Sequence, residues 1–518
     1  MFSMKFKISD FLFKWGIVAA AIIAGITSCA PFRLGESLIS YYCDDFYYYV
    51  VVARNFAATG VSTFDGTALT NGYHPLWFLV LSFLLKLTSG RLFLFCVSLL
   101  TVLGTILTYW LVRSILLLRP AHHSFTFLAC LWVSCFYVHV ARSGMEVILA
   151  VPFAFALFLY WMGDSFRFTP RQCLWSSLLI SALILSRLDT ALLIAGMATL
   201  YLLFGEEGIR ARLRHLALIA AGCLPVYIYL IVNKLVFGMF TPVSGAAKQL
   251  RFTHELDTAV LFSLFIPTGM GTIVFVGVSV LLLFIGCVLM LCGVTSSLRP
   301  NQKVVLASFL LFPLGYFPLL SFLSHYHYFP WYGHPLMPAA VAGLFVLQMF
   351  AEGRGWLALP VARVLGVAGS VLFAVAFLIG LRTPPQQGMI YLAAVEIRNF
   401  ARTHPGNYAM GDRSGIVAYM LPDSVFQLEG LVEDKKFLED MRWSRNLNDE
   451  LRERKIRYYV ATNNVTHSGD CLLTVEPFQP GSGSPQMHGR FCSKPVAFFP
   501  MDGLPPVYVI DLTKEPAQ

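Results

Sequence analysis

The chain has 518 residues, of which 57% are apolar and only 13% are charged. A soluble globular domain carries about twice that share of charged residues, so the composition excludes an ordinary soluble enzyme, a disordered chain and a nucleic-acid-binding protein. The formal net charge is +9, and the excess of basic residues lies in the apolar block, residues 1–381. Basic residues between apolar segments are typical of loops that set membrane topology, not of a nucleic-acid surface.

Apolar runs of the length that a membrane helix needs, about 20 residues, follow one another through this block. The first run, 11–30, comes after three lysines and is predicted to be an uncleaved span with its N-terminus in the cytoplasm. One run, 76–90, is short, and whether it crosses fully stays open, so the prediction is eleven to thirteen spans. The later runs lie at about 76–90, 92–118, 124–141, 147–163, 172–187, 190–204, 215–236, 259–294, 303–322, 333–350 and 361–381.

The segments that connect these runs, called joints below, alternate in charge. Every second joint is rich in Lys and Arg and is expected in the cytoplasm. The other joints then face outward, and so does the tail that begins at residue 382. The outward joints are 31–75, 142–146, 187–189, 237–258 and 323–332.

The tail, 382–518, has an ordinary density of charged residues and differs in kind from the block before it. Its segments YYVAT (458–462) and VYVID (507–511) are typical of buried strands, and 391–402 and 433–454 are typical of helices. Cys471 and Cys492 form a disulfide or remain two free thiols. The sequence predicts an all-α polytopic membrane domain, 1–381, followed by a C-terminal extracytoplasmic α/β domain, 382–518.

The first outer loop, about 31–75, combines an acidic pair with many aromatic residues. Asp44 and Asp45 follow the first span, and Tyr48 is close behind them. Carboxylates near hydrocarbon are expensive and usually functional, and such a group can act as general base toward an acceptor hydroxyl. The alternative is structural, with Asp44 capping an amphipathic helix over 46–57. The loop ends in the motif TNGYHPLW, residues 70–77, which contains Asn71, Tyr73 and His74.

The acidic pair and TNGYHPLW together resemble polytopic membrane glycosyltransferases of the GT-C fold, which use polyprenyl-phosphate-linked sugars. That group includes protein mannosyltransferases, the aminoarabinose transferase of lipid A, and bacterial arabinofuranosyl- and glucosyltransferases. The resemblance covers the apolar block and its first loop, and the tail only by position. It implies a catalytic base at Asp44 or Asp45, and it aligns the family's His-Pro pair with His74 and Pro75. It also implies a second outer acid at Glu146, in the segment ARSGME (141–146).

The same resemblance implies the partners and the location. The donor is a polyprenyl-phosphate sugar, the acceptor is a glycan, lipid or protein, and the enzyme lies in the lipid bilayer of a bacterial inner membrane. Some members hold a divalent cation between their outer acids and others use none. Asp44, Asp45 and Glu146 are the residues that would hold one here, but no cofactor is firmly indicated.

Three further outward segments supply candidate substrate-binding residues. Arg187 and Asp189 are interpreted as a structural ion pair, although the resemblance leaves a substrate-side role open. Lys248 and Arg251 suit the phosphate of a lipid carrier, and the alternative is a basic pair at the level of the headgroups. The segment 325–334 is rich in aromatic residues and is expected to form an interfacial belt that also binds sugar or carrier. Its candidate residues are His325, Tyr328, Trp331 and Tyr332.

A metal site is not predicted in 325–334, because its histidines have no carboxylate or cysteine beside them in the run. The chain also has no P-loop, G-x-S-x-G or HExxH motif, so a nucleotide-sugar site is not indicated. The sequence therefore predicts an inverting membrane glycosyltransferase with a first-loop aspartate as base. Two alternatives stay open. One is a flippase or transporter of a lipid-linked glycan, and the other is a glycan polymerase or ligase that uses a diphosphate-linked donor.

Overall fold

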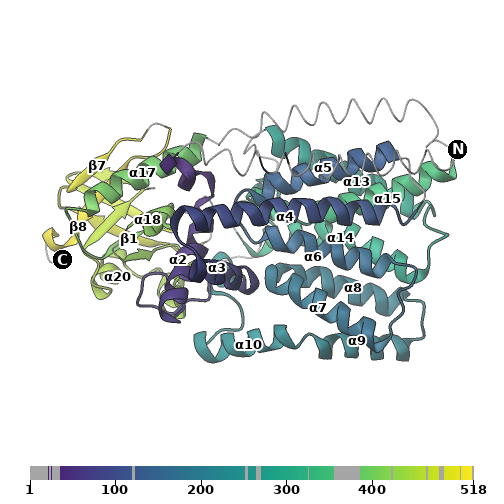
Figure 1. Ribbon diagram of the computed structural model, residues 1–518. Helices are drawn as coiled ribbons and strands as arrows, with labels where there is room; N and C mark the ends of the chain where they lie inside the picture. Colours follow the sequence, from purple (N-terminus) through teal and green to yellow (C-terminus); the bar gives the residue numbers. More distant parts are fainter. Residues whose placement is uncertain are drawn as a thin grey trace.

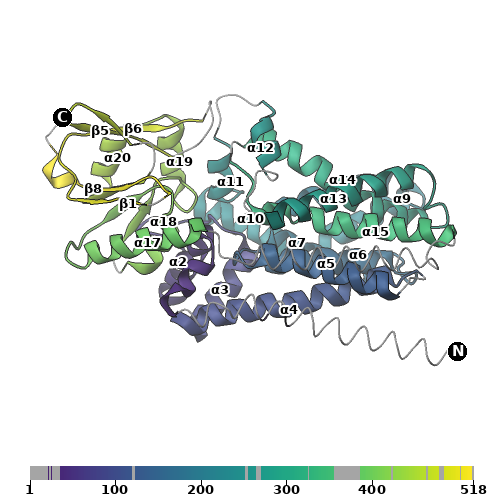
Figure 2. The same ribbon diagram turned by 90° about the horizontal axis from the view of Figure 1, so that it is seen from above.

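The computed structural model describes twelve parts of the chain. They are residues 22, 25, 35–119, 123–250, 255–263, 270–324, 326–354, 385–421, 424–462, 465–477, 484–501 and 503–515. The apolar helices lie side by side in one bundle, both β-sheets lie beyond one end of it, and α2 lies at that end, between the bundle and the sheets (Figures 1 and 2).

The bundle is built from helices that match the predicted apolar runs. They are α3 (Pro75–Leu87), α4 (Gly90–Leu116), α5 (His123–Ala141), α6 (Val147–Met162), α7 (Pro170–Ser186), α8 (Ala191–Phe204), α9 (Ile209–Gly222), α10 (Leu224–Phe237), α13 (Met270–Leu291), α14 (Pro300–Leu323) and α15 (Leu336–Gly353). Four short elements connect them, namely η3 (Leu188–Thr190), α11 (Val243–Lys248), α12 (Thr258–Phe262) and η5 (Pro330–Gly333).

Local start and stop signals explain several of these boundaries. Helix α7 begins after Thr169, whose hydroxyl accepts a hydrogen bond from the backbone N–H of Gln172, and Pro170 occupies the first turn. The run predicted at 215–236 is two helices, α9 and α10, bent by 55°. The bend falls at the residues before Pro225, which lacks the N–H that would continue the ladder of hydrogen bonds.

Four described helices are long and apolar enough to cross a membrane, and α9 with α10 makes a fifth if the bent pair is one span. Shorter apolar helices, among them α3, α6 and α8, lie in the same bundle. Large apolar side chains such as Phe83 and Leu291 are exposed on its outside. These are the features of a multi-pass membrane protein. The count of eleven to thirteen spans stays a prediction, because most of 11–30 and all of 361–381 lie outside the described residues.

The first loop folds into η2 (Gly35–Tyr41) and α2 (Asp44–Thr59) before α3 begins at the end of the TNGYHPLW motif. The helix predicted over 46–57 is therefore confirmed. The alternative in which Asp44 caps this helix is wrong, because the N-cap of α2 is Cys43 and no side chain caps it. Helix α2 is followed by Gly60, where φ is 76°, a conformation that glycine adopts without strain.

The tail contains a five-stranded sheet and a separate three-stranded sheet. The first has the order β2-β1-β3-β8-β7, with β1 parallel to β2 and β3, and β8 antiparallel to β3 and β7. The second is antiparallel, with the order β4-β5-β6. The strands are β1 (Tyr408–Met410), β2 (Val425–Gln427), β3 (Tyr458–Ala461), β4 (Thr466–Ser468), β5 (Cys471–Glu476), β6 (Met487–Phe491), β7 (Ala497–Phe499) and β8 (Val507–Asp511). The tail helices are α17 (Pro385–Ala401), α18 (Ser414–Met420), α19 (Lys435–Arg442) and α20 (Leu447–Glu453).

Both strands predicted in the tail are present, as β3 and β8, and they pair directly. The helix predicted over 391–402 is part of α17, while 433–454 forms two helices, α19 and α20. The proposed domain boundary at residue 382 falls in 355–384, outside the described residues.

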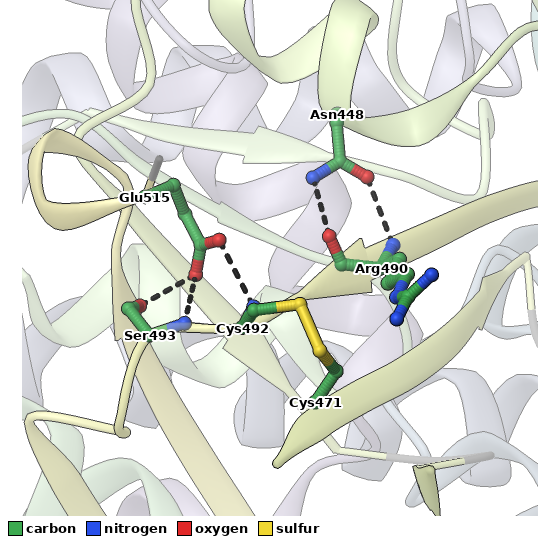
Figure 3. Close-up of a disulfide and its surroundings, with 6 residues drawn as sticks. All are labelled: Asn448, Cys471, Arg490, Cys492, Ser493 and Glu515. Atoms are coloured by element: carbon green, nitrogen blue, oxygen red, sulfur yellow. Dashed lines mark hydrogen bonds between the residues drawn. A yellow bond between two sulfur atoms is a disulfide. The ribbon is translucent and has the colours of Figure 1, made fainter. Parts of the chain in front are cut away.

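A disulfide joins Cys471 at the start of β5 to Cys492 just after β6 (Figure 3). The Glu515 carboxylate accepts hydrogen bonds from the backbone N–H groups of Cys492 and Ser493, each at 3.0 Å. The sequence left open whether the two cysteines pair, and the structure has them bonded.

Candidate functional site

Asp44 points from α2 into the tail. Its carboxylate accepts hydrogen bonds from the backbone N–H groups of Gly415 at 3.1 Å and Ile416 at 2.7 Å, in the first turn of α18. Burial raises the pKa of Asp44 to about 7, although these N–H groups act in the opposite direction. Both oxygens of this carboxylate are thus engaged by the tail, which leaves Asp44 poorly placed to take a proton from a substrate.

Asp45, the next residue, has a different environment. No hydrogen bond joins its carboxyl to another residue in the part of the chain that the structure describes. Burial raises its pKa to about 6, and the positive charge of Lys248 opposes that shift. A carboxyl without a hydrogen-bond partner among the described residues and with a pKa just below neutrality is suited to general-base chemistry.

Lys248 lies at the end of α11 and reaches the aromatic segment before α15. Its Nζ donates a hydrogen bond to the Tyr332 hydroxyl at 2.9 Å and lies 5.7 Å from the centre of the Tyr326 ring. Burial lowers the pKa of this amine, but Tyr332 and Asp45 raise it above its usual value. Lys248 therefore stays protonated near neutral pH and places a positive charge beside Asp45.

A buried ion network joins the second predicted acid to the Arg187–Asp189 pair. The Arg187 guanidinium donates to Glu146, to Asp189 at 3.0 and 3.1 Å, and to the Tyr316 hydroxyl at 3.2 Å. Tyr316 in turn donates to Asp189 at 2.7 Å, and Tyr49 donates to Glu146 at 3.3 Å. The interpretation of Arg187 and Asp189 as an ion pair is confirmed, and Glu146 belongs to the same network.

His74 contacts this network from the end of the TNGYHPLW motif. Its Nδ1 accepts a hydrogen bond from the backbone N–H of Leu188 at 3.1 Å, and its Nε2 is 3.8 Å from a Glu146 oxygen. Burial lowers the pKa of the His74 imidazole. With Nδ1 accepting, the neutral ring carries its proton on Nε2, which faces Glu146.

Two other motif residues have structural contacts. The Asn71 side chain accepts from the backbone N–H of Val243 at 2.9 Å, which holds the start of α11, and so the Lys248 helix, against the first loop. Tyr73 exchanges a hydrogen bond with Ser62 at 2.9 Å and stacks on Phe78. Both residues support the site rather than line it.

The candidate residues of the aromatic segment 325–334 differ in whether they contact the ionic residues. Tyr332 bonds Lys248 and lies under the Arg187 guanidinium, 4.9 Å from ring centre to Cζ. Tyr328 is buried and bonds Ser321 and the carbonyl of Phe317, and Trp331 is buried and stacks on Phe329. Only Tyr332 of these three contacts the ionic residues. The remaining candidates, Arg251 and His325, lie outside the described residues.

The Tyr48 side chain faces the tail and contacts residues that were not predicted as site residues from the sequence. Its hydroxyl donates to Glu429 at 3.2 Å and accepts from Ser414 at 3.2 Å. Burial raises the pKa of Glu429, and the charge of Asp412 raises it further. Asp412 also raises the pKa of Asp45. The segments GDRSG (411–415) and LEGL (428–431) therefore adjoin the first-loop acids.

The predicted acids are not arranged as a cation site. Glu146 is bonded to Arg187 and Asp44 to α18, which leaves Asp45 as the available carboxylate of the three. Over the described ranges, no group of three His, Cys, Asp or Glu side chains is placed to hold a metal ion.

A cavity of about 450 Å³ lies elsewhere, on the three-stranded sheet of the tail. It is lined by residues of β4, β5 and β6 and by Asn446, and none of the candidate residues borders it.

No protein-family model and no curated protein matches this chain. Among solved structures, the crystal structure of the Archaeoglobus fulgidus oligosaccharyltransferase tethered with an acceptor peptide is similar to it. The TM-score is 0.46 and the sequence identity is 13%, over 87% of this chain and 69% of that one. A likeness of this extent does not establish a shared fold or activity, which have to be argued from the residues of the chain itself.

Proposed function

We propose that this chain is an integral membrane glycosyltransferase that moves a sugar from a polyprenyl-phosphate donor to a glycan, lipid or protein acceptor. The observation that carries the proposal is that the charge of Lys248, a half-buried cation, acts on Asp45, a carboxyl without a hydrogen-bond partner among the described residues. The first is suited to deprotonate an acceptor, and the second to bind a phosphate leaving group. The resemblance of the first loop to GT-C enzymes supports the same assignment.

In the proposed reaction, the Asp45 carboxylate takes the proton of the acceptor hydroxyl. The acceptor oxygen attacks the anomeric carbon of the sugar, and the bond between that carbon and the phosphate oxygen breaks. The lipid phosphate leaves with the bonding electrons and is stabilised by Lys248. A single displacement of this kind inverts the anomeric centre. Glu146, His74 and Arg187 fix the position of the loop and need not contact the sugar.

The charges near Asp45 favour a donor with one phosphate. Arg187 is committed to Glu146, Asp189 and Tyr316, and among the described residues Lys248 is the cation whose charge acts on Asp45. One ammonium group matches a monophosphate better than the larger charge of a diphosphate.

We further propose that the enzyme lies in a bacterial inner membrane, with its N-terminus in the cytoplasm and its tail outside. The basic joints support this orientation. The disulfide between Cys471 and Cys492 supports it as well, since disulfides persist in oxidising compartments and are rare in the cytoplasm.

The experiment that tests the function is turnover of lipid-linked sugars by purified protein in detergent. A panel of polyprenyl-monophosphate sugars is offered with a membrane extract as the source of acceptor. We expect transfer by the wild type and a loss of at least about 100-fold in Asp45→Asn, the usual scale of a general base. Asp65→Asn is the matched control, because Asp65 lies in the same loop and its carboxylate accepts hydrogen bonds within a local turn, from Thr63, Thr67 and Ala68.

Two results would contradict the proposal. Full activity of Asp45→Asn would remove Asp45 as the base. Transfer from diphosphate-linked donors alone would indicate the polymerase or ligase, while movement of an unmodified lipid-linked glycan across vesicles, without transfer, would indicate the flippase.

A further inference from the structure

Helix α18 of the tail lies alongside α2 of the first loop, as both views show (Figures 1 and 2). The N-terminal end of α18 is held by the Asp44 carboxylate, through the N–H groups of Gly415 and Ile416. Its C-terminal end is held by Arg54, also on α2, which donates to the carbonyl oxygens of Ala418 at 3.3 Å and Tyr419 at 3.2 Å.

From this geometry we infer that α2 clamps α18 at both ends, and that Asp44 and Arg54 are positioning residues that hold the tail against the candidate site. The part of this inference that concerns catalysis rests on the proposed function. The part that concerns the clamp itself does not.

The charges at the two ends of the clamp match the electrostatics of a helix. The first N–H groups of a helix lack partners and carry partial positive charge, and the last carbonyl groups lack partners and carry partial negative charge. The acid at the first end and the arginine at the second satisfy both. Helix α18 has only seven residues, far below the length at which a helix is stable alone, so contacts of this kind are needed to hold it.

Close packing at each end of the clamp supports the same conclusion. A Cβ atom on Gly415 would lie 2.3 Å from the backbone oxygen of Asp44, so only glycine allows the two helices this approach. Further along, the rings of Tyr47 and Tyr419 are 4.9 Å apart. The contact is therefore packed near both ends of α18 and does not rest on one polar pair.

The clamp has a consequence for Asp45, because Asp412 lies two residues before α18 and its charge acts on the Asp45 carboxyl. When α18 is held, Asp412 is kept near the proposed base, and the tail covers the first loop. When α18 is released, Asp45 gains solvent and loses that neighbour, and both changes lower the pKa of its carboxyl toward the ordinary value.

The test is amide hydrogen exchange on the full-length chain in detergent, combined with turnover. In Asp44→Ala we expect the protection of the α18 amides to fall about 5- to 30-fold, the scale of a lost helix cap. In Asp44→Asn the loss is smaller, since the amide oxygen still accepts a hydrogen bond. Arg54→Ala exposes α18 as well, and Asp65→Asn leaves it unchanged.

Turnover separates a positioning role from a chemical one. We expect Asp44→Ala to lower kcat and to shift the acidic limb of its pH profile to lower pH, with the KM for donor unchanged and with partial rescue in Asp44→Asn. Unchanged exchange of α18 in Asp44→Ala overturns the clamp. So does an Asp44→Asn variant that is as inactive as Asp45→Asn while α18 stays protected, because Asp44 would then act chemically. If the wild type transfers no sugar, the proposed function fails, and the exchange data still decide the clamp.

Discussion

Replacing Arg187 with methionine tests whether this residue is an internal counter-ion. The Arg187 side chain is only 3% exposed, and its guanidinium joins Glu146, which is 1% exposed, to Asp189, which is 23% exposed. Without it, Asp189 keeps the 2.7 Å hydrogen bond from Tyr316 and partial access to water. Glu146 keeps a 3.3 Å hydrogen bond from Tyr49 and has the His74 Nε2 3.8 Å away. The penalty therefore falls mainly on the Glu146 carboxylate, which is left buried without the cation that balances its charge.

Breaking a buried ion pair by removing one partner destabilises a protein by about 3–5 kcal/mol. A chain of this length loses roughly 1 °C of melting temperature per kcal/mol, so Arg187→Met is expected to melt about 3–5 °C below the wild type. Changing Glu146 to Gln in the same protein removes the stranded charge and should restore most of the loss. The measurement is thermal unfolding in detergent, followed by tryptophan fluorescence.

The matched control is Arg210→Met, because Arg210 is exposed on α9, and we expect no resolvable change there. The reasoning is refuted if Arg187→Met melts within 1 °C of the wild type, or if the double variant Glu146→Gln, Arg187→Met is less stable than the single one. Arg187 would then not be the counter-ion of Glu146, and a direct role in binding substrate would become the better explanation.

Two further predictions concern pH. Transfer should increase between about pH 5 and 7 as the Asp45 carboxyl ionises, since its pKa is about 6, and Lys248→Gln should move this limb to higher pH by removing a stabilising charge. A profile of kcat against pH checks both, and a flat profile would contradict them. Burial raises the pKa of Glu476 to about 8 from an ordinary value of 4.5. Between these values the folded chain holds a proton that the unfolded chain has lost, so stability decreases as pH rises, by up to about 5 kcal/mol. Glu476→Gln should keep the hydrogen bond from Tyr459 and melt above the wild type at pH 8 but not at pH 4.5; equal melting of the two at pH 8 would refute this.

Patterns within a short stretch of sequence predicted their structures well. The strands at 458–462 and 507–511 were visible as apolar β-branched and aromatic runs, and 46–57 as a helix. Arg187 and Asp189 were recognisable as a pair, because two opposite charges stood alone in a long apolar run. The bend between α9 and α10 was missed, although Pro225 was visible as its cause.

Contacts between distant segments explain what the sequence could not show. Asp44 seemed equivalent to Asp45, and only the folded tail separates them, by placing the N–H groups of α18 on one carboxylate and not on the other. No role was predicted for the segment 411–415 from the sequence. Its two glycines, Gly411 and Gly415, were the feature that could have indicated close packing. A Cβ on Gly411 would collide with Glu476, and a Cβ on Gly415 would collide with Asp44. Tyr316 gave no signal, being one aromatic residue within an apolar helix.

The contact between Asp44 and Ile416 joins residues 372 positions apart. At about 5–20 residues per second, the ribosome makes α18 roughly 20–70 seconds after α2. Throughout that interval the first loop has emerged, and Asp44 and Arg54 have no helix to hold. The nascent protein therefore passes through a stage in which the described helices of the bundle have been made while α18 does not yet cover the candidate site. A chain truncated before residue 411 would remain at that stage, because it would lack α18 entirely.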